Sequence, residues 1–200
     1  SCAELTEEYL MLPRGCEDTV ITLLREKDVP YRIEDKSNHG KPISVQFNGV
    51  LRDNQQEAVN ILASNNNGVL SATTAFGKKV TAIGLIAKHE LNTLVLVHTK
   101  ALLDQWVKAL KQFLTINTIP EEDEGKCKRR KPLLSIGTLS STGNKLHGII
   151  DIALMQSCIS GNDVKPFVKE YGMVIADECH HVSAVNFEQI LKAANAHYVY

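Results

Sequence analysis

Short apolar runs alternate with helical segments from residue 51 to residue 200, and this alternation restricts the possible folds more than any other feature of the chain. Residues 94–98 are nearly all apolar, as a strand covered on both faces requires. Strands that are separated by helices pair in parallel through right-handed crossovers. The expected fold class is therefore α/β: a parallel sheet with helices on both faces.

The individual strands are predicted from short apolar runs, and the helices from a 3.6-residue period of apolar positions. The predicted strands lie at residues 69–72, 94–98, 132–138, 149–154 and 173–176. The predicted helices lie at residues 54–63, 77–89, 101–113, 164–169 and 185–194. Residues 197–200 have the composition of the middle of a buried strand, so we expect the sequence to be a piece of a longer protein.

The first 48 residues have a different pattern and are expected to form a small accessory module. Residues 4–12 predict a strand that ends at a Pro-Arg-Gly turn. Residues 16–27 have helical spacing, with acidic side chains in the first turn and basic ones in the last. Residues 31–34 alternate as a strand does. We therefore expect a β-α-β appendage at residues 1–48 and a larger domain at residues 49–200.

The composition excludes several classes of protein. The 22 Lys and Arg residues nearly balance 23 Asp and Glu residues, which argues against a protein that coats nucleic acid through bulk positive charge. A hydrophobic share of 44% is too high for a disordered chain. No apolar run reaches the ~18–20 residues of a membrane span, so no membrane partner is expected. Five cysteines without a Cys-x-x-Cys pair argue against a disulfide framework or a zinc site, and a cytoplasmic location is expected.

Residues 72–79 follow a predicted strand and begin a predicted helix, where a phosphate-binding loop is found in α/β folds. In such a loop, backbone N–H groups and the helix N-terminus face the anion, and a lysine reaches the terminal phosphates. Lys78 is the candidate for this lysine. The residues expected to bind the nucleotide are Thr73, Thr74, Ala75, Phe76, Gly77, Lys78 and Lys79. The alternative is an ordinary strand-to-helix turn with an exposed lysine.

The loop departs from the usual pattern at two positions. Ala72 stands where the first glycine is expected, and Lys79 stands where a Ser or Thr hydroxyl usually binds Mg²⁺. An ammonium cannot coordinate a metal ion and repels it, although the long side chain of Lys79 could swing outward. We therefore expect nucleotide binding to survive through the backbone and Lys78, and metal positioning to be weakened.

Residues 173–176 form an apolar run that ends in two carboxylates, Asp177 and Glu178. Ligands of an open parallel sheet gather outside the carboxyl ends of its strands, so this pair and the phosphate loop should face one crevice. Asp177 suits Mg²⁺, directly or through water, and Glu178 suits the positioning or deprotonation of an attacking water. The alternative is that the two acids only cap the next helix.

Residues 121–131 place an acidic block directly before a basic block. Such a stretch is typically a solvated loop. Its basic half could instead contact a phosphate backbone.

Together these motifs resemble those of superfamily-two helicases. Residues 177–180, Asp-Glu-Cys-His, are similar to the D-E-x-H box, which gives His180 a place in the catalytic motif. The stretch from 51 to 200 resembles the first RecA-like domain of these proteins, and in particular the res subunits of type III restriction enzymes and the excision-repair helicases. The further matching segments are residues 51–55 (the L-R-x-x-Q glutamine motif), 97–106 (motif Ia), 136–138 (a short Gly motif) and 153–157 (a T-x-x-S-type motif).

The resemblance implies an ATP-dependent DNA helicase or translocase with ATP and Mg²⁺ as cofactors. Gln55 would read the adenine, Asp177 would hold the Mg²⁺, and Glu178 would position the water. A second RecA-like domain of the same parent chain would supply arginines, so this piece alone should be nearly inactive. The residues implied to contact nucleic acid, DNA rather than RNA and mainly at phosphates, are Thr99, Lys100, Gly137, Thr138, Gln156 and Ser157.

Two other functions remain open from the sequence. The chain could be a nucleotide-binding or nucleic-acid-binding module without hydrolysis, in which Lys79 has ended catalysis. It could also be a small-molecule kinase or another phosphate-loop enzyme, although the ordered motifs between residues 94 and 157 argue against this.

Overall fold

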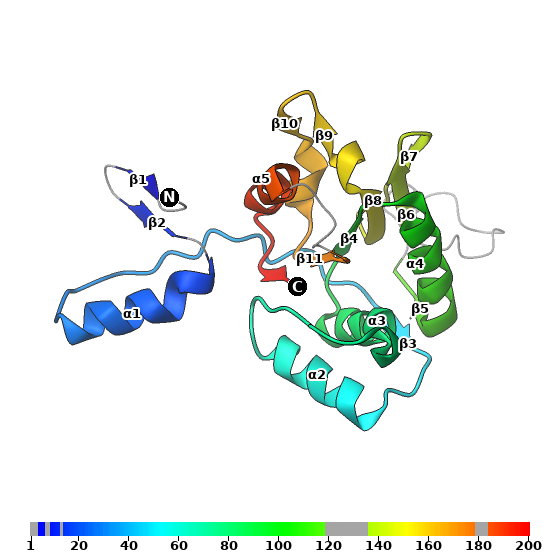
Figure 1. Ribbon diagram of the computed structural model, residues 1–200, viewed down its shortest axis with the longest axis horizontal. Helices are drawn as coiled ribbons and strands as arrows, with labels where there is room; N and C mark the ends of the chain where they lie inside the picture. Colours follow the sequence, from blue (N-terminus) through cyan, green and yellow to red (C-terminus); the bar gives the residue numbers. More distant parts are fainter. Residues whose placement is uncertain (1–3, 7–8, 13, 119–135, 179–183) are drawn as a thin grey trace. The chain divides into compact units, whose positions relative to one another are not determined.

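A computed structural model describes residues 4–6, 9–12, 14–118, 136–178 and 184–200 of the chain (Figure 1). The chain divides into two compact units, residues 1–36 and residues 37–200. The second unit begins at residue 37, ahead of the domain start that the sequence predicts at residue 49.

The first unit contains a short hairpin and one helix. Strand β1 (Glu4–Leu5) pairs antiparallel with β2 (Leu10–Met11), and α1 (Glu17–Glu26) follows the 3₁₀ turn η1 (Arg14–Cys16). The β-α-β prediction was therefore wrong in two places. Residues 4–12 form a hairpin instead of one strand, because Thr6 donates its backbone N–H to the carbonyl of Tyr9. Residues 31–34 form no strand, since no described segment pairs with them.

The second unit is built on a sheet that confirms the predicted α/β class. In the described part of the chain this sheet has six strands. The first five run parallel, and the last runs antiparallel to its neighbour. In spatial order they are β12 (Tyr198–Val199), β11 (Met173–Ala176), β4 (Thr93–Val97), β8 (Ile150–Leu154), β6 (Ile136–Ser140) and β7 (Gly143–Lys145).

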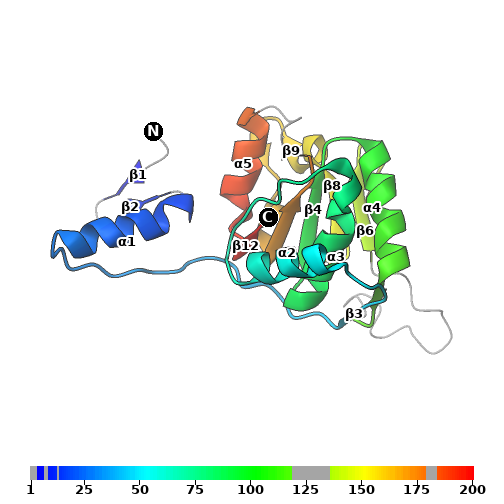
Figure 2. The same cartoon turned by 60° about the horizontal axis from the view of Figure 1, so that its bottom comes forward.

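Helices cover both faces of the sheet, as the sequence predicts (Figure 2). Successive side chains of a strand point to opposite faces, so Val95 and Val97 of β4 face one core while Leu94 and Leu96 face the other. The first core also contains residues of α3 (Lys78–His89) and α4 (Lys100–Phe113). The second contains residues of α5 (Ala184–Ala194), η4 (Met155–Cys158) and η5 (Pro166–Glu170).

Smaller elements complete the unit. Helix α2 (Asp53–Ala63) packs against α3. Strand β3 (Val45–Phe47) pairs antiparallel with β5 (Leu114–Ile116), which directly follows α4. A short hairpin joins β9 (Ile159–Ser160) to β10 (Asp163–Val164).

Three predicted elements differ from the structure. Residues 69–72 form no strand: the bridge to β12 lies earlier, from Asn67 to Val199, and Val69 is 85% exposed. The helix predicted at residues 164–169 is the short 3₁₀ segment η5, which begins at Pro166. The strand predicted at residues 132–138 starts at Ile136 and continues to Ser140, while residues 132–135 lie outside the described residues.

Within the described residues, no helix combines the length and the apolar character that a membrane span requires.

The last residue of α3, His89, should make the stability of the fold depend on pH. Its Nε2 lies 3.1 Å from the hydroxyl oxygen of Tyr200, and its ring centroid lies 4.0 Å from that of Tyr198. Burial first, and then repulsion by His197 and Lys88, lowers the pKa of His89 below its usual 6.5. The unfolded chain binds a proton at His89 more readily than the folded chain does. The stability that His89 contributes is therefore fully present above the pKa of the unfolded chain, and it is lost as the pH falls through the lower pKa of the folded chain.

We therefore expect the wild-type chain to unfold at lower temperature near pH ~5.5 than near pH ~7.5, and the His89→Gln variant to show a smaller difference. Thermal denaturation followed by circular dichroism at both pH values measures this. Equal pH dependence in the two proteins would contradict the assignment to His89.

Candidate functional site

The predicted phosphate loop lies directly before α3 and turns at a glycine. Residues 74–76 form the 3₁₀ helix η2 (Thr74–Phe76), and Gly77 then adopts φ = 85°, in the left-handed region. A Cβ atom at Gly77 would lie only 2.6 Å from the side-chain nitrogen of Gln55. Glycine is thus required here both by the backbone angle and by the neighbouring side chain. The turn brings the loop to the N-terminus of α3, where backbone N–H groups can face an anion.

The start of α2 holds the loop from outside. Gln55, only 5% exposed, accepts a hydrogen bond from the backbone N–H of Arg52 (3.0 Å) and donates one to the carbonyl of Phe76 (2.7 Å). The guanidinium of Arg52 also donates to the carbonyls of Ala75 and Phe76. The structure therefore uses the Gln55 amide to fix the loop backbone, and its contact with adenine stays a prediction.

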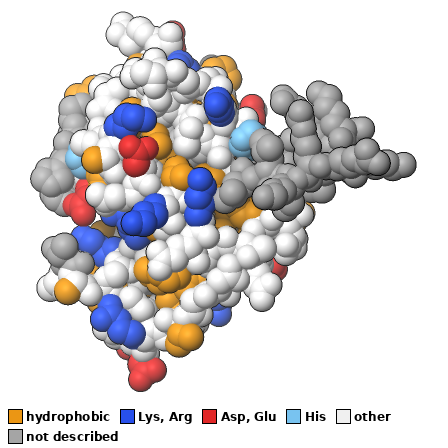
Figure 3. Space-filling model, turned by 90° about the vertical axis from the view of Figure 1, so that its right-hand side faces the viewer, with side chains coloured by type: hydrophobic (Ala, Val, Ile, Leu, Met, Phe, Trp, Pro, Cys, Tyr) orange, Lys and Arg blue, Asp and Glu red, His pale blue; other side chains and the backbone are white. Residues whose placement is uncertain are grey.

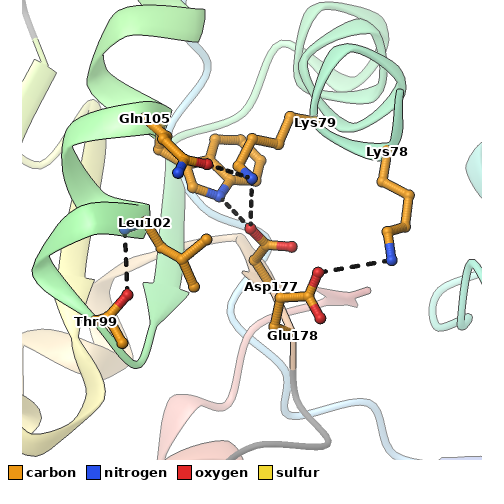
Figure 4. A network of polar contacts seen from close by, with 8 residues as sticks. Lys78, Lys79, Thr99, Leu102, Gln105, Asp177 and Glu178 are labelled. Carbon is orange, nitrogen blue, oxygen red and sulfur yellow. Dashed lines mark hydrogen bonds and ion pairs between the residues drawn. The ribbon is translucent and has the colours of Figure 1, made fainter. Parts of the chain in front are cut away.

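Two lysines that begin α3 meet the two carboxylates that follow β11 (Figure 4). The Nζ atom of Lys78 lies 3.7 Å from Oε1 of Glu178, and Nζ of Lys79 lies 3.5 Å from Oδ2 of Asp177. The phosphate loop and the acidic pair thus face one crevice at the carboxyl edge of the sheet, where ligands of parallel sheets bind.

Asp177 is held by a third element, helix α4. The indole nitrogen of Trp106 donates a 2.7 Å hydrogen bond to Oδ2 of Asp177, and the Asp177 side chain is 9% exposed. Lys79 also donates to the side-chain oxygen of Gln105 at 3.2 Å. The sequence predicts no separate role for Gln105 and Trp106 beyond their place in the segment that resembles motif Ia. The available signal was the single tryptophan on a helix next to the site, because a buried indole N–H needs an acceptor.

The backbone of Glu178 adopts an uncommon conformation that turns its side chain toward Lys78. Its φ is 55°, a left-handed value that costs a non-glycine residue about 1 kcal/mol or more. The strand β11 ends two residues earlier, at Ala176. The turn at Glu178 therefore directs the carboxylate toward α3 at some cost in stability.

A cavity of about 670 Å³ opens beside these four charged groups. Its volume lies within the range of typical ligand pockets. Apolar side chains from the loop, the sheet edge and α5 form much of its wall, which suits the flat face of a nucleobase. The lining includes Leu70, Ala82, Trp106, Phe187, Leu191 and Tyr200, together with Lys78, Asp177 and Glu178.

The residues around Asp177 do not fit the Mg²⁺ ion that the resemblance implies. Magnesium requires oxygen ligands in near-octahedral geometry. Oδ2 of Asp177 already accepts from Trp106 and pairs with Lys79, and the Lys79 ammonium has no lone pair to offer a metal.

Four of the predicted nucleic-acid contacts follow the carboxyl ends of β4 and β8. Thr99 caps α4 by accepting from the backbone N–H of Leu102 at 3.2 Å, and Lys100 pairs with Asp104 at 3.9 Å. The Gln156 amide donates to the carbonyl of His98, which joins the two strand ends. Ser157 lies beside it in η4.

Gly137 and Thr138 are not at that edge, which corrects the expected placement. They are the second and third residues of β6, where they pair with Asp151 and Ile152 of β8, and the strand continues to Ser140. Gly137 has a packing role, because a Cβ atom there would lie 1.9 Å from a carboxylate oxygen of Asp151. The predicted strand ended too early, which put both residues at the wrong end of the sheet.

On the face in Figure 3, the Lys and Arg side chains lie apart from one another, with neutral and apolar surface between them. His180 and the charged stretch at residues 121–131 lie outside the described residues.

The chain is similar in sequence to helicases. It matches the family described as type III restriction enzyme, res subunit, over residues 48–199. Protein 161L of Invertebrate iridescent virus 6, named as a helicase, is 33% identical over 146 residues, which cover 71% of this chain and 30% of that protein. Rad25 of Halobacterium salinarum, named as a DNA 3'-5' helicase, is 30% identical over 163 residues, which cover 80% of this chain and 24% of that protein. L396 of Acanthamoeba polyphaga mimivirus, named as an ATP-dependent RNA helicase, is 26% identical over 172 residues, or 84% of this chain and 30% of that protein.

The chain thus spans less than a third of the length of each of these relatives. The crystal structure of the UvsW helicase from bacteriophage T4 resembles it with a TM-score of 0.65 at 16% identity, covering 98% of this chain and 72% of that chain. At this identity the likeness shows the fold. From the family match and the shared fold, the chain belongs to the family of the type III restriction enzyme res subunit and contains a RecA-like helicase domain of superfamily two.

Proposed function

We propose that this chain is the ATP-binding first RecA-like domain of a DNA helicase or translocase, which couples ATP hydrolysis to movement along nucleic acid. The observation that carries the proposal is the meeting of the phosphate-loop lysines with Asp177 and Glu178 in one crevice beside a 670 Å³ cavity. A turn with an ordinary exposed lysine would not bring four charged side chains from two distant segments together.

In this proposal each group of the crevice has a separate task. The loop amides and Lys78 bind the terminal phosphates, and Gln55 holds the loop in the shape that this requires. Glu178 orients the attacking water and accepts its proton. A second RecA-like domain of the parent chain supplies arginines that stabilise charge in the transition state, a contribution worth about 10³–10⁵ in rate. This chain alone should therefore hydrolyse ATP very slowly.

The nucleic acid is proposed to cross the carboxyl edge of the sheet. Thr99, Lys100, Gln156 and Ser157 lie there and would contact phosphates without reading bases. DNA is favoured because Rad25, at 30% identity, is named as a DNA helicase, whereas the RNA-named L396 is 26% identical. We place the protein in the cytoplasm, where the thiols of Cys16 and Cys158 would stay reduced.

A second candidate function is a nucleotide-binding module without hydrolysis. The specific observation in its favour is the pair between Lys79 and Asp177, which occupies the carboxylate that would otherwise take part in catalysis.

The proposed function is tested by ligand binding to the 200-residue chain. We expect calorimetry to detect binding of ATP. We also expect fluorescence anisotropy to show that a single-stranded DNA oligonucleotide binds more tightly than an RNA of equal sequence. One side of a groove contacts few phosphates, so DNA affinity should be low and should fall as salt rises. Absence of ATP binding, both with and without metal, would refute the proposed function.

Hydrolysis distinguishes the two candidates and requires the full-length parent. A DNA-stimulated ATPase in that protein supports the motor. Activity that appears only after Lys79→Thr supports the binding module.

A further inference from the structure

We infer that the Lys79 ammonium stands in for a divalent cation, so that the chain binds a nucleoside triphosphate in its metal-free form. The inference rests on the proposed function, because it concerns the same crevice. It goes further by naming the form of the ligand, and its starting point is the misfit between Mg²⁺ and the residues around Asp177.

The Lys79 side chain is held at the acidic pair from two directions (Figure 4). Its Nζ lies 3.5 Å from Oδ2 of Asp177 and 3.2 Å from the side-chain oxygen of Gln105. The Lys79 side chain is 27% exposed, so it does not swing outward into solvent as its length would permit. The ammonium thus lies between the end of β11 and helix α4.

The position of Lys79 in α3 makes this contact unusual. It is the second residue of the helix, where the partial positive charge of the helix N-terminus disfavours a cation. A neighbouring cation, Lys78, adds repulsion. The pair with a nearly buried carboxylate offsets both effects, and Trp106 fixes that carboxylate by its indole N–H. The cation is therefore part of a built site.

The charge balance of the crevice shows what the lysine replaces. Lys78 and Lys79 carry two positive charges, and Asp177 and Glu178 carry two negative charges, so the described crevice is neutral. With a threonine at position 79, one carboxylate would stay uncompensated and would attract a divalent cation. With the lysine present, the same cation would have to displace an ammonium from Asp177 and tolerate its repulsion nearby.

A triphosphate without metal suits this arrangement. Its negative charge would meet the Lys78 ammonium, the Lys79 ammonium and the N-terminus of α3 together. The ordinary role of a bound metal, neutralising phosphate charge, is then supplied by the protein itself. A lysine that only stabilised the fold would pair with Asp177 in the same way, but it would not change how ATP binding responds to metal.

The test is calorimetric titration of ATP into the 200-residue chain, once in EDTA and once in excess Mg²⁺. For the wild-type chain we expect dissociation constants within about threefold of each other. For Lys79→Thr we expect affinity in EDTA to fall about tenfold or more, the loss of one charge-assisted contact. Magnesium should then restore about tenfold in that variant, because its crevice has gained a net negative charge.

Two further variants separate charge from other effects. Lys79→Met keeps most of the length of the side chain without its charge or a metal-binding hydroxyl, and should lose affinity in EDTA as Lys79→Thr does. Lys108→Thr makes the same chemical change at an exposed position of α4 and should behave as the wild-type chain. Circular dichroism checks that each variant is folded. If the Thr variant does not fold, the titration of the Met variant tests the inference instead.

A wild-type chain that binds ATP at least tenfold more tightly in Mg²⁺ than in EDTA would overturn this inference and leave the proposed function intact. A wild-type chain that binds ATP under neither condition would overturn both.

Discussion

Replacing Lys78 with alanine is expected to weaken ATP binding by the chain about 100-fold. The Lys78 ammonium lies 3.7 Å from Glu178 at the mouth of the crevice, with 33% of its side chain exposed, so it can move from the carboxylate to a phosphate. A hydrogen bond to a charged group contributes about 1.5–3 kcal/mol, and the loss of one such contact at the upper end of this range weakens binding about 100-fold. The loss should be measured by the same calorimetry as above.

The matched control for Lys78 is Lys88→Ala in the last turn of the same helix. Lys88 donates to Asn60 of α2 and lies ten residues further along α3, about 15 Å from Lys78. Its replacement should leave ATP affinity unchanged within about twofold. Equal losses in both variants would mean that overall charge, and not the crevice, attracts the nucleotide.

Replacing Asp151 with alanine is expected to lower the free energy of unfolding by about 3–5 kcal/mol. Asp151 is fully buried in β8 and accepts backbone N–H groups of His147 and Gly148, at 3.0 and 2.7 Å, and the Tyr171 hydroxyl at 2.5 Å. Burial, together with the nearby carboxylate, raises the pKa of Tyr171, so the hydroxyl stays a donor. Alanine would leave these donors unsatisfied inside the protein.

Urea denaturation measures this loss, which is a large share of the ~5–15 kcal/mol of a typical domain. Tyr171→Phe removes one of the three donors and should cost about 1.5–3 kcal/mol. Asp104→Ala removes an exposed carboxylate, with 65% of its side chain in solvent, and should cost less than about 1 kcal/mol. A cost for Asp151→Ala no larger than that of Asp104→Ala would show that the hydrogen bonds of the buried carboxylate do not stabilise the fold.

Most elements of the second unit could be predicted because their signals are local. The apolar run of β4 and the helical period of α4 lie within a few residues of the predicted bounds. The strand predictions were wrong where the pairing with another strand decides whether a segment becomes a strand. Residues 69–72 have the composition of a strand, but β12 is bonded by residues 66–68 instead. Residues 31–34 alternate correctly and find no partner among the described strands.

For the site, the sequence indicated the two segments but not the contacts within them. The motif around Lys78 and the acids at Asp177 and Glu178 were predicted from residue types that follow apolar runs. The role of Trp106 could not be predicted, because 71 residues separate it from Asp177. The sequence does not determine the direction in which the Lys79 side chain points, since a long side chain has many rotamers and only its surroundings select one.

The order of apolar and polar residues thus determined by itself that strands would alternate with helices, that a phosphate loop would stand at the start of α3, and that an acidic pair would follow β11. Local periodicity and turn chemistry are sufficient for this, because they act between residues close in the chain. The tertiary structure alone decided that Lys79 points at Asp177 and that Trp106 and Gln105 fix this pair. Such contacts depend on the packing of α4 against the sheet, which brings together charges that no pattern in the sequence relates.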